Sequence, residues 1–110
     1  MNKFRCALLL MVAWSNVAYA LDHELQRGRD LLETLCARCH AVGTTGRSPH
    51  PDAPPFRTFG EKLYDDDLGQ RLQDGLTTIH PDMPTFLFKR RDAQAAVNYL
   101  KSIQQKKKSE

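Results

Sequence analysis

The feature that most constrains this chain is a five-residue segment, Cys36-Ala37-Arg38-Cys39-His40, in which two cysteines and a histidine stand at fixed spacing. Cysteines three positions apart share one face of a helical turn, so both thiols can react with neighbouring groups on one edge of a flat molecule. The histidine that follows can turn its imidazole toward the centre of that molecule. This spacing is the attachment signal of a c-type haem, with Cys36 and Cys39 as thioether links and His40 as an axial iron ligand.

Three other kinds of site could use part of this segment. A disulfide between Cys36 and Cys39 would suit an oxidising compartment but would not need His40. A thioredoxin-like redox motif requires a βαβ setting, of which the sequence gives no sign. A structural zinc site requires four ligands, and only two cysteines follow residue 20.

The first twenty residues have the pattern of a secretory signal peptide. Lys3 and Arg5 form a positive start, an apolar stretch runs from Cys6 to Val17, and Ala18-Tyr19-Ala20 supplies small residues for cleavage. The apolar stretch is shorter than the roughly 20 residues that a membrane-spanning helix needs. We therefore expect export to the periplasm, cleavage after Ala20 and no stable membrane insertion afterwards. An uncleaved membrane anchor is the alternative.

Removal of residues 1–20 leaves 90 of the 110 residues and lowers the formal net charge from +3 to +1, because Lys3 and Arg5 are lost. Such a weak charge does not favour a nucleic-acid partner. We expect one domain at 21–105, followed by a flexible basic tail at 106–110. Beyond residue 20 the chain has four Phe, two Tyr and no Trp. A core this small usually requires a cofactor, and a buried porphyrin would add apolar volume.

Hydrophobic spacing predicts three amphipathic helices, at about 22–40, 65–75 and 92–105, with proline- and glycine-rich connections between them. Gly75 suits a C-cap and Asp92 an N-cap. Neither strand alternation nor an internal repeat is evident, so the predicted class is all-α. The expected apolar faces are Leu25, Gly28, Leu32, Leu35, Cys36 and Cys39 in the first helix, Leu68 and Leu72 in the second, and Ala93, Ala96, Val97, Leu100 and Ile103 in the third.

Met83 is the candidate for the second axial ligand. It is the only methionine after residue 20, and Pro81 and Pro84 flank it in the connection before the third helix. A thioether on iron favours the ferrous state and raises the reduction potential. His80, His50 or an open coordination position are the alternatives.

The chain resembles the class I c-type cytochromes, in particular the small single-haem proteins of the bacterial periplasm. The resemblance rests on the haem motif, on Ala53-Pro54-Pro55-Phe56, on His80-Pro81-Asp82-Met83-Pro84 and on Asn98-Tyr99-Leu100-Lys101, and it covers residues 21–105. It implies the cytochrome c fold, with three main helices and loops around one covalent haem c. It further implies a close helix crossing of Gly28 against Ala96 and Tyr99. By the same resemblance, the carbonyl of Pro54 or Pro55 accepts a hydrogen bond from the His40 ring.

By this resemblance the protein is expected to carry single electrons between redox protein partners, with His40 and Met83 on the iron, and not to be an enzyme. One alternative is a haem c electron-acceptor subunit of a periplasmic dehydrogenase or oxidase, and another is a gas-binding haem protein. The mitochondrial relatives use a tryptophan on a haem propionate, which is missing here. Tyr64, Arg57 and Arg71 are candidates to replace it.

Overall fold

The computed structural model describes residues 2–65, 67–76 and 80–105, with side chains from residue 14 onward apart from Asp65. This part of the chain is helical and contains no strand, so the all-α prediction is confirmed. The elements in order are α1 (Asn2–Cys36), the 3₁₀ helix η1 (Phe56–Thr58), α2 (Lys62–Asp65), α3 (Leu68–Asp74) and α4 (Arg90–Ser102). The predicted basic tail at 106–110 lies outside the described residues.

The three predicted helices exist, but their ends differ from the prediction. Helix α1 runs unbroken through the predicted signal segment and ends at Cys36, four residues before the predicted end. In α3 the Oδ1 of Asp67 accepts the Gln70 N–H and caps the first turn, while Gly75 is the C-cap with a φ of +94°. The single turn of α2 was not predicted.

The prediction that Asp92 caps the third helix is wrong. The N-cap is Lys89, whose backbone is extended, and Asp92 lies in the first turn of α4. There its carboxylate is stabilised by the positive end of the helix dipole, and it also forms an ion pair with Arg27 of α1. Asp92 therefore joins two helices instead of starting one.

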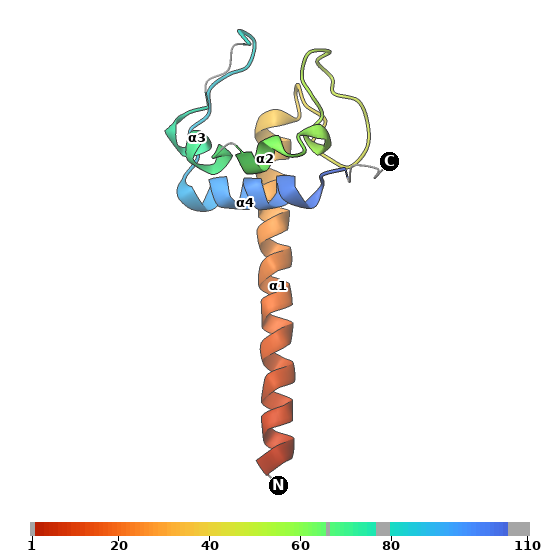
Figure 1. Ribbon diagram of the computed structural model, residues 1–110, viewed down its shortest axis with the longest axis vertical. Helices are drawn as coiled ribbons and strands as arrows, with labels where there is room; N and C mark the ends of the chain where they lie inside the picture. The colour runs from red at the N-terminus through yellow and green to blue at the C-terminus, as the bar shows by residue number, and fades with distance from the viewer. Residues whose placement is uncertain (1, 66, 77–79, 106–110) are drawn as a thin grey trace.

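Helices α1 and α4 cross closely, and α2, α3 and the loops lie on one side of α4, while the N-terminal part of α1 extends away on the other side (Figure 1). At the crossing, a Cβ added to Gly28 would lie 2.6 Å from the carbonyl carbon of Ala95 and 2.9 Å from the Cβ of Tyr99. The close approach predicted at Gly28 is therefore present, with Ala95 and not Ala96 as the nearest residue besides Tyr99. The Tyr99 hydroxyl extends the contact by donating to the carbonyl of Val42 at 3.0 Å.

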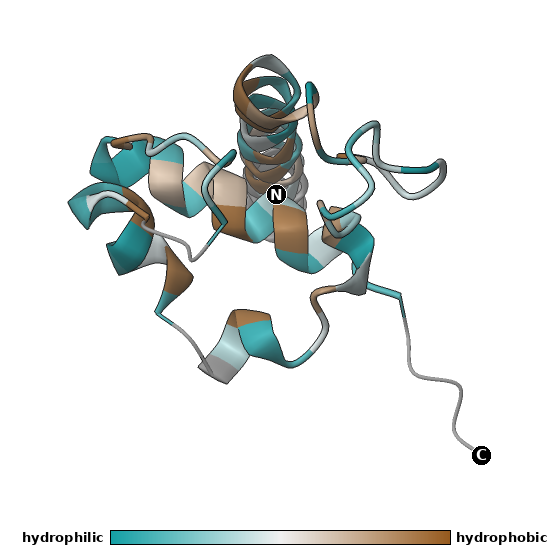
Figure 2. Ribbon diagram, turned by 90° about the horizontal axis from the view of Figure 1, so that it is seen from above, coloured by the Kyte–Doolittle hydropathy of each residue, from teal (hydrophilic) through white to brown (hydrophobic). Residues whose placement is uncertain are grey.

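The apolar core lies between α4, the end of α1 and the segments that follow (Figure 2). Its buried members are Leu32, Val42, Phe56, Leu63, Leu72, Phe88, Ala93, Ala96, Tyr99, Leu100 and Ile103. Among the described residues no large side chain is fully buried, so the protein atoms alone make a thin core. None of the helices in the described part is long and apolar enough to cross a membrane.

Candidate haem site

The Cys-His segment forms a turn at the end of α1. The carbonyl of Cys36 accepts the N–H of Cys39 at 3.1 Å and the N–H of His40 at 2.9 Å. Both cysteines are half-buried and have free thiols. The helix predicted to continue to His40 is thus replaced by a tight turn that keeps Cys36, Cys39 and His40 together.

The state of the thiols bears on the alternative sites. Burial raises the pKa of the Cys36 thiol to about 11, and the neighbouring Cys39 adds to this rise. Redox-active cysteines of the thioredoxin kind have lowered pKa values, so this shift has the wrong direction for them. Among the described residues no three His, Cys, Asp or Glu side chains are grouped as metal ligands, whereas a structural zinc site has four ligands.

The ring of His40 is held from two directions. Its Nδ1 lies 2.8 Å from the carbonyl oxygen of Pro54, and its ring stacks on Phe56 with 4.6 Å between centroids and 30° between planes. A carbonyl oxygen only accepts, so Nδ1 carries the proton in neutral His40 and Nε2 keeps a free lone pair. The carbonyl of Pro55, the other candidate, accepts instead from the backbone and hydroxyl of Thr58.

Met83 is half-buried in the connection between α3 and α4. Its N–H donates to the carbonyl of His80 at 3.2 Å, which closes a turn around the Pro81-Asp82 pair. Farther along, the N–H of Phe88 donates to the carbonyl of Leu72 at 2.9 Å and fixes this connection to the end of α3.

The two alternative histidine ligands, His50 and His80, lie beside each other. Their ring centroids are 5.9 Å apart in an edge-to-face arrangement, and each faces an aspartate of the other loop. The prediction treated them only as possible iron ligands and missed this pairing. The signal that could have revealed it is the repetition of His-Pro-Asp at 50–52 and 80–82.

The three candidates for a haem propionate differ in their surroundings. Tyr64 is 66% exposed, and the ammonium group of Lys101 lies over its ring. Arg71 is exposed on α3. Arg57 has a buried Nη1 without a hydrogen-bond partner in the structure. A buried donor of this kind normally has a partner, and a carboxylate is the one that an arginine binds best, so Arg57 fits a propionate.

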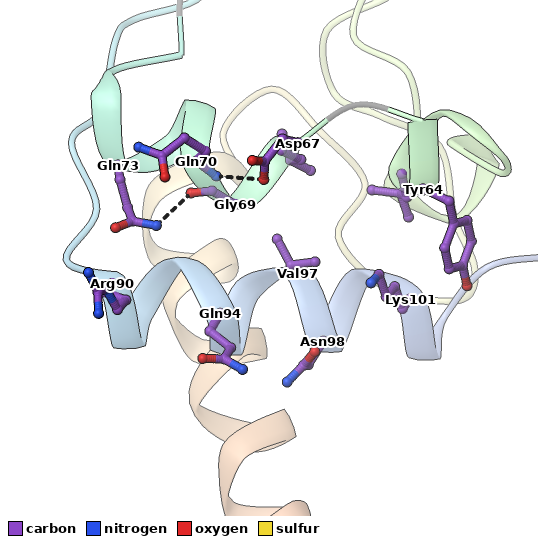
Figure 3. Close-up of a pocket in the computed structure, with 12 residues that line it drawn as sticks. Tyr64, Asp67, Gly69, Gln70, Gln73, Arg90, Gln94, Val97, Asn98 and Lys101 are labelled. Atoms are coloured by element: carbon purple, nitrogen blue, oxygen red, sulfur yellow. Dashed lines mark hydrogen bonds between the residues drawn. The ribbon is translucent and has the colours of Figure 1, made fainter.

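A cavity of about 550 Å³ opens between the α2–α3 region and α4 (Figure 3). Its wall is mostly polar and includes two local hydrogen bonds, from the Gln70 N–H to Asp67 and from the Gln73 amide to the Gly69 carbonyl. No cysteine, histidine or methionine lines it, and its lining includes Tyr64, one of the propionate candidates.

Comparison with known proteins gives a consistent result. Residues 23–100 match the family described as cytochrome c oxidase, cbb3-type, subunit III. The chain is also 30% identical over 98 residues to cytochrome c-552 of Bradyrhizobium diazoefficiens, which spans 89% of this chain and 90% of that protein. No solved structure gives a significant match.

The residues present fit a haem c. Two free thiols stand in one turn, a histidine nitrogen beside them keeps its lone pair, and a thin apolar core lies next to them. The half-buried Leu35, Phe59 and Phe86 pack against that core and leave apolar surface for a porphyrin. With the two matches to c-type cytochromes, these features show that the chain belongs to the class I c-type cytochromes, electron-transfer proteins with one covalently attached, iron-containing haem c.

Proposed function

We propose that this protein is an exported single-electron carrier of the periplasm, with His40 and Met83 as axial ligands of the haem iron, and that it is not an enzyme. The observation that carries the proposal is the His40 ring, whose Nδ1 proton faces the Pro54 carbonyl beside two free cysteines. That hydrogen bond makes Nε2 the ligating atom and sets the tautomer in advance.

Each part of the site has a defined task. Haem c, when bound, supplies an iron that exchanges one electron between the ferric and ferrous states. Cys36 and Cys39 would hold the group to the end of α1 through thioether links, each thiol supplying its sulfur and proton to one vinyl double bond. Phe56 restricts rotation of the His40 ring through the stacking contact. Arg57 offers its buried nitrogen to a propionate.

Ligation of the iron by Met83 distinguishes an electron carrier from a haem protein that reacts with a substrate or a gas. A thioether in the sixth position favours ferrous iron and raises the potential, and it leaves no open position for a substrate or a gas. His40 and Met83 as two fixed ligands also keep the coordination similar in both oxidation states. Little rearrangement then accompanies electron transfer, as a carrier requires.

A second candidate function is a haem c subunit of an oxidase. It is favoured by the family match, because that family is described as a subunit of a cbb3-type cytochrome c oxidase. Gel filtration of native periplasmic extract separates the two: a carrier elutes as a small single protein, and a subunit elutes with its complex. The same extract shows whether the chain begins at Leu21, as cleavage after Ala20 requires.

The test of the ligand set compares three variants of the holoprotein. Met83→Ala should abolish the weak far-red charge-transfer band of ferric iron–thioether bonding, lower the potential and allow carbon monoxide to bind reduced protein. Met83→His should keep six-coordinate iron at a lower potential. His80→Ala should not abolish the band. If His80→Ala removes the sixth ligand and Met83→Ala does not, the proposed ligation is wrong.

A further inference from the structure

Two loops of this protein carry the same three residues and pair them crosswise. His50-Pro51-Asp52 lies in the loop after the Cys-His turn, and His80-Pro81-Asp82 lies before Met83; both loops rise on the same side of α4 (Figure 1). Nε2 of His50 lies 3.7 Å from Oδ2 of Asp82, and Nε2 of His80 lies 3.7 Å from Oδ2 of Asp52. We call these four residues, His50, Asp52, His80 and Asp82, the His–Asp clasp.

One half of the clasp is fixed to the haem-attachment turn. The N–H of His50 donates to the carbonyl of Cys39 at 3.1 Å. The Nδ1 of His50 accepts the N–H of Asp52 at 3.2 Å, so neutral His50 carries its proton on Nε2. That proton is on the side of the ring that faces Asp82. Contacts within its own loop and to the haem-attachment turn therefore fix the orientation of His50.

The other half is joined directly to Met83. The Met83 N–H donates to the His80 carbonyl at 3.2 Å, so His80, Asp82 and Met83 belong to one turn. A force on His80 or Asp82 is thus transmitted to Met83 through the backbone. Together, the contacts of both halves form a path from Cys39 to Met83 that does not pass through the haem.

The clasp attaches the two loops to each other through several weak contacts. Its side chains are 31–70% exposed, and an exposed pair contributes only about 0–1 kcal/mol even when the imidazole is protonated and the pair is ionic. His50 faces the carboxylate of Asp82 and His80 faces that of Asp52, and among the described residues these side chains are not grouped as ligands of a cation. The edge-to-face contact of His50 and His80 adds a third small contribution between the same loops. The arrangement holds two loops together without making a metal site.

We propose that the His–Asp clasp positions Met83 by holding its turn against the haem-attachment segment, and so sets how often the sixth ligand leaves. The four residues are positioning residues that act through the backbone of Met83. This inference rests on the proposed ligation of the iron by Met83.

The test measures how fast carbon monoxide binds to reduced holoprotein, because binding requires Met83 to leave first. The double variant Asp52→Asn with Asp82→Asn keeps the size of both side chains and removes the charges that face the imidazoles. Its binding rate should rise about three- to tenfold over the wild type, as expected for the loss of two exposed pairs. Each single variant should give a smaller rise. The far-red band of the ferric double variant should be weaker and its reduction potential lower.

Two further proteins make the test specific. Asp74→Asn on α3 loses one negative charge, as each single variant does, and can still accept from Gln70, so it should bind carbon monoxide at the wild-type rate. The exchange variant Asp52→His with His80→Asp puts the imidazole and the carboxylate of one pair in each other's positions. Its binding rate should be closer to that of the wild type than the rate of the single variant Asp52→Asn. A rescue of this kind is not expected from a general loss of stability.

Two outcomes would overturn the inference in distinguishable ways. If Met83→Ala speeds carbon monoxide binding but the Asp52/Asp82 double variant binds at the wild-type rate with an unchanged far-red band, Met83 is the ligand and the clasp does not position it. If Met83→Ala leaves carbon monoxide binding and the band unchanged, the proposed ligation fails and the clasp inference falls with it.

Discussion

Replacing Gly28 with alanine should destabilise the protein, because the helix crossing has no room for a single methyl group. The added Cβ would meet the carbonyl carbon of Ala95 at 2.6 Å and the Cβ of Tyr99 at 2.9 Å, with the Ala95 carbonyl oxygen closer still, whereas ordinary contacts begin at 3.4 Å. Two of these atoms are backbone and cannot rotate away. The helices must therefore separate by about 1 Å, and a packed core resists such a shift.

The magnitude follows from two opposing effects. Overpacking a tight contact costs about 1–3 kcal/mol, and rigid backbone atoms place this site at the upper end. Alanine regains about 1 kcal/mol of helix propensity over glycine in α1. The free energy of unfolding should thus fall by about 2 kcal/mol, and Gly28→Val should cost more because it adds two further methyl groups.

Guanidinium denaturation of the ferric holoprotein, followed by haem absorbance and far-ultraviolet circular dichroism, measures this change. The midpoint should fall while the slope stays constant. Gly43→Ala is the matched control, since no heavy atom lies within 4 Å of its added Cβ, and it should stay within about 0.5 kcal/mol of the wild type. An unchanged midpoint for Gly28→Ala would refute the tight crossing.

Three other changes have defined outcomes. Gly69→Ala should raise the thermal midpoint by the equivalent of about 0.5–1 kcal/mol, because its Cβ would meet Val97 at an ordinary 3.8 Å and alanine favours the helix; a lower midpoint would contradict this packing. Tyr99→Phe should cost about 1 kcal/mol in chemical denaturation through loss of the hydrogen bond to Val42. Cys36→Ala with Cys39→Ala should give a haem-free chain that is largely unfolded by circular dichroism, since the protein core is thin; a compact helical product would oppose that reasoning.

Local patterns predicted the fold class and the approximate positions of α3 and α4, because apolar spacing and Gly75 at a helix end act within a few residues. The role of Asp92 was not predictable in this way. Its position in the sequence favours an N-cap, whereas in the fold its partner is Arg27, 65 residues away. The end of α1 at Cys36 was missed for a related reason, since the turn is closed by backbone bonds that any sequence could form.

The features of the candidate site differ in the same way: some could be predicted from neighbouring residues in the sequence, and others depend on the fold. Cys36, Cys39 and His40 are contiguous, so their chemistry could be inferred from spacing alone. The hydrogen bond between His40 and Pro54 was expected only by resemblance, because no local rule joins a ring to a carbonyl 14 residues away. The His–Asp clasp was missed altogether. Two three-residue matches are too short to count as a repeat, and they gain meaning only when the fold sets one loop beside the other.

The crossing of α1 with α4 also bears on the order of events as the chain is made. Cys36 to His40 emerge early in synthesis, whereas α4 begins fifty residues after His40, at Arg90. Until α4 arrives, Leu32 and the rest of the apolar face of α1 have no helix to pack against, and closing so long a loop costs entropy that local contacts do not repay. The attachment segment is thus complete while the molecule is still open. A haem that is joined to Cys36 and Cys39 at that stage would be enclosed when α4 packs against α1.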